Sequence, residues 1–115
     1  IRGMSTEAHS PRKGYAIFVE EITDWDSYLE EYLPAAGETV DDHGGELTVW
    51  DRDPEVIEGE WDHNMTVVVE FPSVEDAKAW YNDPDYEELK SVRHEACEYS
   101  HAIITPEFSA EDLPG

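Results

Sequence analysis

The spacing of apolar residues changes period several times along the chain, and it predicts four strands and two helical regions. Runs of β-branched and aromatic residues predict strands at 15–22, 46–50, 65–71 and 99–105. Between the first two strands, apolar residues recur at helical spacing from Trp25 to Val40, and Pro34 is expected to kink or split this helix. Ser73 is a suitable N-cap for a helix over 74–81, and Pro84 begins another helix that runs towards Ala96.

The element order is therefore β-α-β-β-α-β, which predicts an α+β ferredoxin-like two-layer sandwich with both helical regions on one face of the sheet. In the third strand, the alternating residues Met65, Val67, Val69 and Phe71 are expected to face the helices. The opposite face is expected to carry Thr66, Val68, Glu70 and, from the other strands, Phe18, Ile22, Thr48 and Trp50. Large apolar side chains on an open face indicate that a second subunit covers it, so we predict a homodimer.

Acidic residues dominate the composition and exclude several classes of partner. The 115 residues include 29 Asp and Glu but only 7 Lys and Arg, giving a net charge of −22. Phosphate backbones and anionic lipid headgroups would repel such a surface, so no nucleic-acid or membrane partner is expected. The acids are spread along the chain and only three residues are lysine, a composition typical of a cytosolic protein from an extreme halophile.

The ends of the chain differ from its middle. Residues 1–13 are predicted to be a disordered tail that begins with a vector remnant, Ile1-Arg2-Gly3, before Met4. Residues 14–106 are predicted to form the ferredoxin-like domain, and residues 107–115 a C-terminal tail. Cys97 is the single cysteine, which fits a reducing compartment, and it is expected to be a small buried residue. We therefore expect a cytoplasmic protein.

Several short segments of the chain are similar to one known family. They are Gly14-Tyr15, His43-Gly44-Gly45, Glu58-Gly59-Glu60-Trp61, Glu70-Phe71-Pro72-Ser73 and the run from Ala79 to Tyr86. Over residues 13–105 the sequence resembles the domain of unknown function 1330 family, of the dimeric α/β-barrel superfamily. The resemblance implies ferredoxin-like subunits packed sheet against sheet. Superfamily relatives include cofactor-free monooxygenases, haem-degrading enzymes and lactone isomerases, but the family itself implies no particular reaction.

Arg93 is the most informative candidate among the rare basic residues. Lys78 and Lys90 each have an acid three residues earlier in their helix, whereas Arg93 has no acid at helical spacing. Its guanidinium must therefore meet an anion elsewhere, either in a salt bridge or on a substrate carboxylate or enolate. Glu20 and Glu70 share the predicted parity of the open face and could form an acid–base pair, although facing acids are expected by chance in so acidic a chain.

The remaining candidates are aromatic residues and histidines around the second helical region. Tyr81 and His94 join Arg93 as candidate catalytic groups, and a pocket lined by aromatic residues is expected to lie between helices and sheet. The predicted pocket residues are Trp80, Tyr86, Tyr28, Glu70 and His43, although the aromatic residues are equally compatible with core packing. No histidine has a second ligand at metal-binding spacing, so neither a metal nor a cofactor is predicted.

Two functions remain open on these observations. One is an enzyme without a bound cofactor that acts on a small apolar or aromatic acid by oxygenation or isomerisation, through Arg93 and a Tyr or His. That reaction class rests on the superfamily analogy. The other is a non-catalytic ligand-binding or structural dimer that uses the same cleft. The first requires an open cleft beside Arg93, and the second requires Arg93 to be tied to an acid.

Overall fold

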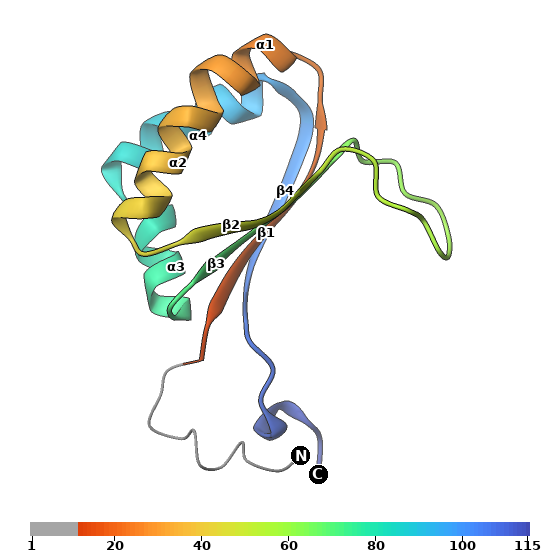
Figure 1. Cartoon of the computed structure of the whole chain (residues 1–115), viewed down its shortest axis with the longest axis vertical. Helices are drawn as coiled ribbons and strands as arrows, with labels where there is room; N and C mark the ends of the chain where they lie inside the picture. The colour runs from red at the N-terminus through yellow and green to blue at the C-terminus, as the bar shows by residue number, and fades with distance from the viewer. Residues whose placement is uncertain (1–11) are drawn as a thin grey trace.

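A four-stranded antiparallel sheet carries all the helices of the domain on one face, as Figure 1 shows for the computed structural model, which describes residues 12–115. The predicted vector remnant lies outside the described residues. The strand order is β2-β3-β1-β4, with bounds β1 Gly14–Ile22, β2 Glu46–Asp51, β3 Met65–Phe71 and β4 Cys97–Pro106. The predicted βαββαβ order and the α+β ferredoxin-like fold are confirmed by the element order and the strand order.

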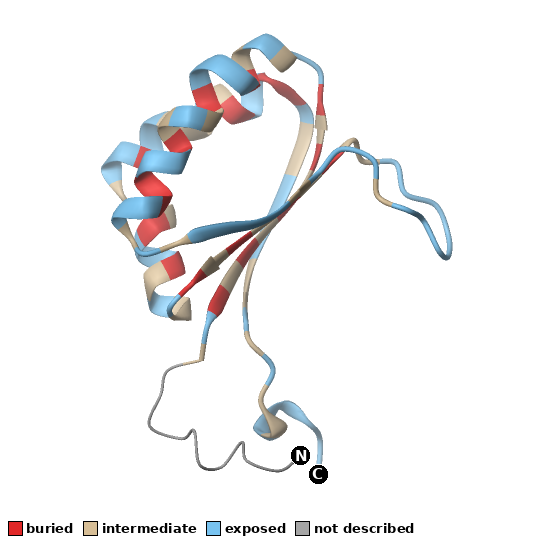
Figure 2. Cartoon of the chain, viewed as in Figure 1, coloured by how far each residue is buried: buried red, intermediate tan, exposed pale blue. Residues whose placement is uncertain are grey.

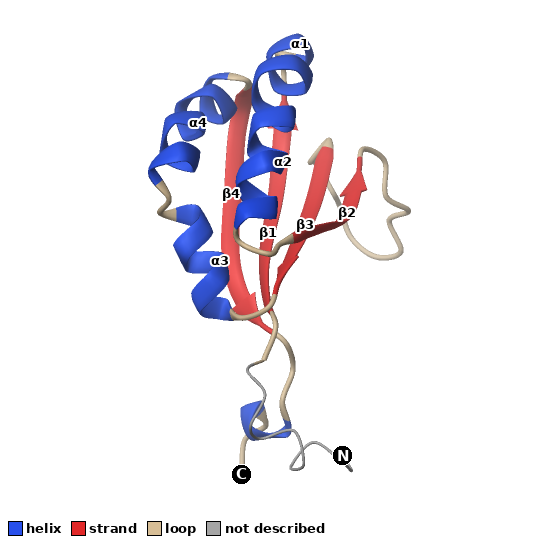
Figure 3. Ribbon diagram, turned by 60° about the vertical axis from the view of Figure 1, so that its left-hand side comes forward, coloured by secondary structure: helices blue, strands red, loops and turns tan. Residues whose placement is uncertain are grey.

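The helical layer has two parts, which lie side by side over the sheet in Figure 3. The first is one continuous helical segment made of α1 (Trp25–Ser27), a π-helical turn η2 (Tyr28–Tyr32) and α2 (Leu33–Asp42). The second consists of α3 (Val74–Tyr81) and α4 (Pro84–Glu95), which are separated at Asn82 and Asp83. Across residues 12–115, no helix has the length and apolar character needed to cross a membrane.

Pro34 shapes the first helical segment, although it does not split it. A proline has no N–H to donate, and its ring would collide with the carbonyl group four residues earlier in a regular α-helix. The chain widens into a π-turn immediately before this position, where the Leu33 N–H bonds to the carbonyl oxygen of Tyr28. The segment ends at Asp42, and the positive φ of 73° at Gly44 permits the Gly45 N–H to bond to the Val40 carbonyl oxygen at 2.9 Å.

Ser73 and Asp83 begin the two helices of the second part. The Ser73 side chain accepts a hydrogen bond from the Asp76 N–H, and the Asp83 side chain accepts one from the Asp85 N–H. Gly14 at the start of β1 passes so close to α3 that an added Cβ would lie 2.6 Å from the Ser73 carbonyl oxygen. These features place α3 directly against the first strand.

The core lies between the helices and the sheet, and the red segments of the strands and helices in Figure 2 are the buried residues that form it. Burial alternates along β1 and β3, and Met65, Val67, Val69 and Phe71 face the helices as predicted. Cys97 is buried, also as predicted, and burial raises the pKa of its thiol to about 12.

The prediction for the open face was right for Thr66, Val68 and Glu70 of β3 but wrong for Phe18, Ile22 and Trp50. Phe18 lies opposite Val67 in the β1–β3 register, and directly opposed residues share a face, so Phe18 points towards the helices. Ile22 is likewise buried, and Trp50 lies opposite Val67 from the other side. The residues 15–22 are apolar on both faces, so their alternation alone did not identify the inner one.

The open face is nevertheless apolar. It carries Ile17 and Val19 of β1, Val68 of β3, Val49 of β2 and Ile103 of β4, and Ile103 is 58% exposed. His101 is also on this face and exposed, opposite Val19. The argument for a covering subunit therefore applies to a different set of side chains.

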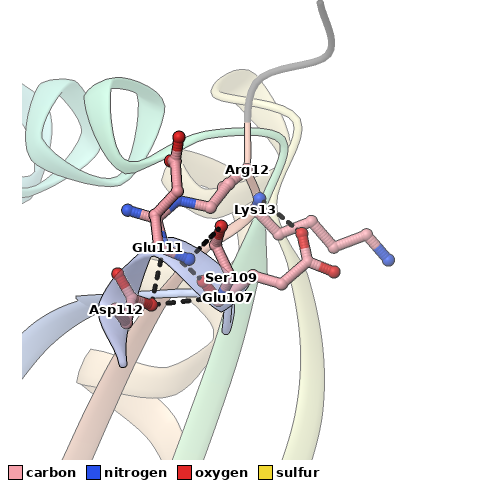
Figure 4. A network of polar contacts seen from close by, with 6 residues as sticks. All are labelled: Arg12, Lys13, Glu107, Ser109, Glu111 and Asp112. Carbon is pink, nitrogen blue, oxygen red and sulfur yellow. Dashed lines mark hydrogen bonds and ion pairs between the residues drawn. The ribbon is translucent and has the colours of Figure 1, made fainter. Parts of the chain in front are cut away.

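Two segments extend beyond the sandwich. The β2–β3 connection projects from the side of the sheet opposite the helices in Figure 1, and its Val56, Ile57 and Trp61 are exposed. The C-terminal segment carries a short turn, η3 (Ala110–Asp112), that is held beside the start of β1 (Figure 4). There Arg12 pairs with Asp112 at 2.8 Å, and the Lys13 N–H donates to the Glu107 carboxylate at 3.1 Å.

Candidate functional site

A cavity of about 340 Å³ lies between the first helical segment and the inner face of β1, β2 and β3. Most of its wall is apolar or aromatic, formed by residues that include Phe18, Tyr28, Tyr32, Leu47, Val67 and Trp80. Three carboxylates, Glu20, Glu38 and Asp41, also line it, and the described lining contains no lysine or arginine. Its volume is in the range of small-molecule sites.

Glu20 is the buried ionisable group of this wall. It occupies an inward position of β1 and is 1% exposed. The Ser100 hydroxyl donates to Glu20 Oε2 at 2.6 Å, and Arg93 Nη1 lies 3.7 Å from the same oxygen. Burial raises the pKa of Glu20, against the opposing effects of Ser100, Arg93 and Tyr28, which lower it. A carboxyl with a raised pKa can both accept and donate a proton nearer neutral pH.

Arg93 lies behind Glu20 and is not part of the cavity wall. It is 2% exposed, its Nη1 donates to the Ser100 hydroxyl, and its guanidinium carbon lies 5.1 Å from the centre of the Phe18 ring. Its Nε has no hydrogen-bond partner among the described residues. The anion that Arg93 meets in this structure is therefore Glu20, as the salt-bridge alternative requires.

Tyrosine hydroxyls flank the carboxylate. Tyr28 and Tyr32 both reach the cavity from the π-turn, and the Tyr32 hydroxyl is 2.6 Å from the Tyr86 hydroxyl. Burial, together with the Glu20 charge, raises the pKa of Tyr28, and burial raises the pKa of Tyr32. Both phenols therefore remain protonated at neutral pH and can serve as hydrogen-bond donors.

The predicted aromatic residues divide between the wall and the layer behind it. Trp80 and Tyr28 line the cavity, and Trp80 Nε1 donates to the Thr39 hydroxyl at 3.0 Å. Tyr86 is fully buried behind Trp80, with ring centres 4.2 Å apart. Tyr81 lies outside the wall, under the Lys90 ammonium group, which is 3.6 Å from its ring centre.

The remaining predicted site residues are away from the cavity. His43 Nε2 is 2.7 Å from Asp83 Oδ2, and this contact lowers the pKa of Asp83. His94 is exposed on α4, and partial burial with the charges of Arg93 and Lys90 lowers its pKa. Glu70 lies on the open face of β3, where its carboxylate is 3.4 Å from Lys13 Nζ.

The proposed pairing of Glu20 with Glu70 was wrong. Glu20 lies opposite Met65, whereas Glu70 lies opposite Tyr15, so the two carboxylates are on opposite faces of the sheet. The residue that sequence reasoning undervalued is Glu20. Glu20 alternates with Ala16, Phe18 and Ile22 along β1, so it is an acid on the same inward face as these apolar residues. This pattern can be recognised only when the inner face of the strand is known.

Residues 12–115 contain no candidate metal site. No group of three or more His, Cys, Asp or Glu side chains there has the arrangement needed to hold an ion.

The fold and the cavity define an α+β ferredoxin-like protein with a small-molecule-sized pocket under its first helical segment. The chain belongs to the family described as Domain of unknown function (DUF1330), whose profile matches residues 13–106. No curated protein matches the chain.

Solved structures show the same fold. A protein of unknown function from Rhodopseudomonas palustris has a TM-score of 0.71 at 19% identity, covering 91% of this chain and 90% of that one. A hydroxynitrile lyase from Passiflora edulis has a TM-score of 0.64 at 17% identity, with 90% and 99% covered. An ethyl tert-butyl ether d (ethd) family protein from Bacillus halodurans has a TM-score of 0.61 at 11% identity, with 84% and 99% covered.

Proposed function

We propose that this protein is a small-molecule enzyme that catalyses isomerisation by proton transfer, with Glu20 as the acid–base group. The observation that carries the proposal is a single buried carboxyl of raised pKa in the wall of an otherwise largely apolar cavity. Buried carboxyls in such surroundings commonly perform acid–base catalysis. The hydroxynitrile lyase of similar fold supports catalysis in this architecture by analogy alone.

The reaction that suits these groups begins at a C–H bond next to a C=O or C=N group of the substrate. Ionised Glu20 takes the proton, and the C–H electron pair becomes part of an enolate or enamine. Tyr28 and Tyr32 line the same cavity, and their hydroxyls would donate hydrogen bonds to the atom that gains electron density. Protonated Glu20 then delivers the proton to the other end of the delocalised anion, which is the γ-carbon of a β,γ-unsaturated ketone or the former C=N carbon of an imine. This step restores the carboxylate, shifts the double bond and completes the isomerisation. The groups of this wall serve proton transfer, so we favour isomerisation over oxygenation.

A non-catalytic ligand-binding protein is the second candidate, and one observation favours it. Glu20 is engaged by Ser100 at 2.6 Å and by Arg93 at 3.7 Å, an arrangement that also suits a purely structural buried pair. In that case the cavity would hold a ligand without changing it.

The proposal includes the assembly and the setting of the protein. Two subunits would pack sheet against sheet through the apolar open face, which the superfamily arrangement and the exposed Val49 and Ile103 support. The net charge of −22 supports a cytoplasm of high salt concentration, where screening reduces self-repulsion.

Deuterium exchange tests the proposed chemistry directly. The protein is incubated in D₂O and high salt with small aromatic and aliphatic ketones and imines, and loss of the C–H signal is followed by NMR. The wild type is expected to accelerate exchange on some of these compounds, and Glu20→Gln should abolish the acceleration. Glu31→Gln is the matched control, because Glu31 is exposed on the π-turn and outside the cavity wall.

Binding and exchange are read separately, so each outcome decides between the candidates. Compounds that bind without exchange in the wild type would overturn the enzyme and leave the ligand-binding protein. Acceleration that survives Glu20→Gln would overturn the assignment to Glu20. Absence of binding by the whole set would overturn both candidates.

A further inference from the structure

The charges around the cavity all have one sign. Glu20 lies in its wall, Glu38 and Asp41 contribute to the same lining from α2, and no lysine or arginine of the described chain does. Arg93 is positive, but it is buried next to Glu20 and, unlike Glu20, does not contribute to the lining. The ion pair therefore presents its negative end to a bound molecule.

The rest of the lining suits a positive group as well. Phe18, Tyr28, Tyr32 and Trp80 place four aromatic rings around the cavity. Aromatic faces attract organic cations, most strongly where water is excluded. The charge of the whole chain, −22, adds a field that raises the local concentration of cations and lowers that of anions.

We propose that the cavity is a site for small organic cations, namely a protonated amine or imine nitrogen attached to an apolar body, with Glu20 as its counter-ion. This inference rests on the proposed function in that it assigns the charge class of the ligand in the same cavity. It opposes the acidic ligand that Arg93 indicated from the sequence, because the guanidinium that would have held a carboxylate is already engaged by Glu20 and Ser100.

The physical argument compares three ligands with the same apolar body. Each would gain the same burial against the aromatic wall, so their affinities would differ only through the charged or polar group. An ammonium group would offset the cost of burying ionised Glu20, an alcohol would not, and a carboxylate would add a second negative charge to the same cavity. The expected order of affinity is therefore cation, neutral molecule, anion.

Phenethylamine, phenethyl alcohol and 3-phenylpropanoate provide such a series, because each carries its polar group on a phenethyl body. Their binding to the full chain is measured by NMR titration at fixed high ionic strength, so that general screening is the same for all three. We expect phenethylamine to bind at least tenfold more tightly than phenethyl alcohol, and 3-phenylpropanoate to bind most weakly. Glu20→Gln should reduce the preference for the amine over the alcohol to less than threefold, because the counter-ion is lost while the apolar wall remains.

The control is Glu31→Gln, which removes one negative charge from the first helical segment, outside the cavity wall, and should leave the preference unchanged. Should Glu20→Gln fail to fold, the double variant Glu38→Gln/Asp41→Asn tests the same field from the α2 side and should lower the preference at least threefold. Equal or tighter binding of the alcohol or 3-phenylpropanoate would overturn this inference and leave the proposed function standing. Failure of all three probes to bind would overturn the inference, and failure of the ketones and imines as well would overturn the proposed function with it.

Discussion

Replacing Arg93 with methionine is expected to destabilise the folded protein by about 4 kcal/mol at neutral pH. Methionine keeps an unbranched apolar side chain but leaves the Glu20 carboxylate, which is 1% exposed, without its cation. At the 3.7 Å separation of Arg93 Nη1 and Glu20 Oε2, an effective dielectric constant of about 20 gives an attraction of about 4 kcal/mol. Losses on breaking a buried ion pair lie in the same range, about 3–5 kcal/mol.

The loss of stability in the Arg93→Met variant is expected to become smaller as the pH falls, because Glu20 can bind a proton and so cease to be an unpaired buried charge. Burial raises the pKa of Glu20, and removing Arg93 removes one of the groups that lower it. A carboxyl whose pKa is higher in the folded than in the unfolded state favours folding at low pH. The stability contributed by protonation of Glu20 is fully present below the pKa of the unfolded state, about 4.3, and is lost as the pH rises through the pKa of the folded state. The variant should therefore come closest to the wild type in acid.

Urea unfolding followed by tryptophan fluorescence, at a fixed high salt concentration and at several pH values, measures both effects. Lys90→Met is the matched control, since it removes one positive charge from the same helix where the partner Glu87 is 58% exposed. This variant should lose about 1 kcal/mol or less of its free energy of unfolding. Equal losses in the two variants, or a loss at Arg93 that does not change with pH, would refute the assignment of a buried, charge-stabilising pair.

Three further variants or conditions test the surface and the backbone. Val68→Glu places a charge on the open sheet face and should convert dimers into monomers in light-scattering measurements; dimers of unchanged affinity would contradict the sheet-to-sheet arrangement. Raising KCl from low to molar concentration should move the urea midpoint upwards, because it screens a net charge of −22, and a constant midpoint would count against this. Gly44→Ala should cost about 1–2 kcal/mol in the same unfolding assay, since Gly44 has a φ of 73°; a loss near zero would show that the turn can rearrange.

The sequence was sufficient to predict the order of elements and the inner face of β3, because both depend on local signals. Ser73, Asp83 and Pro84 define helix starts through hydrogen bonds within a few residues, and Met65 to Phe71 alternate cleanly. The inner face of β1 could not be predicted in the same way. Ile17 and Val19 are as apolar as Phe18 and Ile22, so only the register against β3 decides which set is buried.

The site was harder to predict than the fold because its groups meet through the tertiary structure. Arg93 was correctly expected to need an anion from elsewhere, but its partner lies 73 residues earlier in the chain, at a position whose inward direction depended on the β1 register. Tyr28 and Tyr32 are four residues apart and would share a face of any helix. The direction of that face relative to α2 depends on the π-turn, for which the sequence provides only Pro34 as a signal.

Pro34 therefore connects the local sequence to the site, and its replacement by alanine is the final prediction. Alanine can donate the missing N–H and has no ring to exclude the preceding carbonyl, so the π-turn could relax into regular α-helix. Shifting the helical register by one residue would rotate Tyr28 by about 100° relative to α2 and move it away from Glu20. Phenethylamine affinity should fall severalfold while unfolding remains cooperative.

Pro84→Ala is the matched control for this change. Pro84 also lies in the first turn of a helix, but α4 begins at Pro84, so no helical turn precedes it to change register. Its replacement should therefore leave phenethylamine affinity unchanged. Equal affinities in wild type, Pro34→Ala and Pro84→Ala would mean that the π-turn does not depend on Pro34, or that Tyr28 contributes nothing to binding. Either result would remove the link between this proline and the cavity.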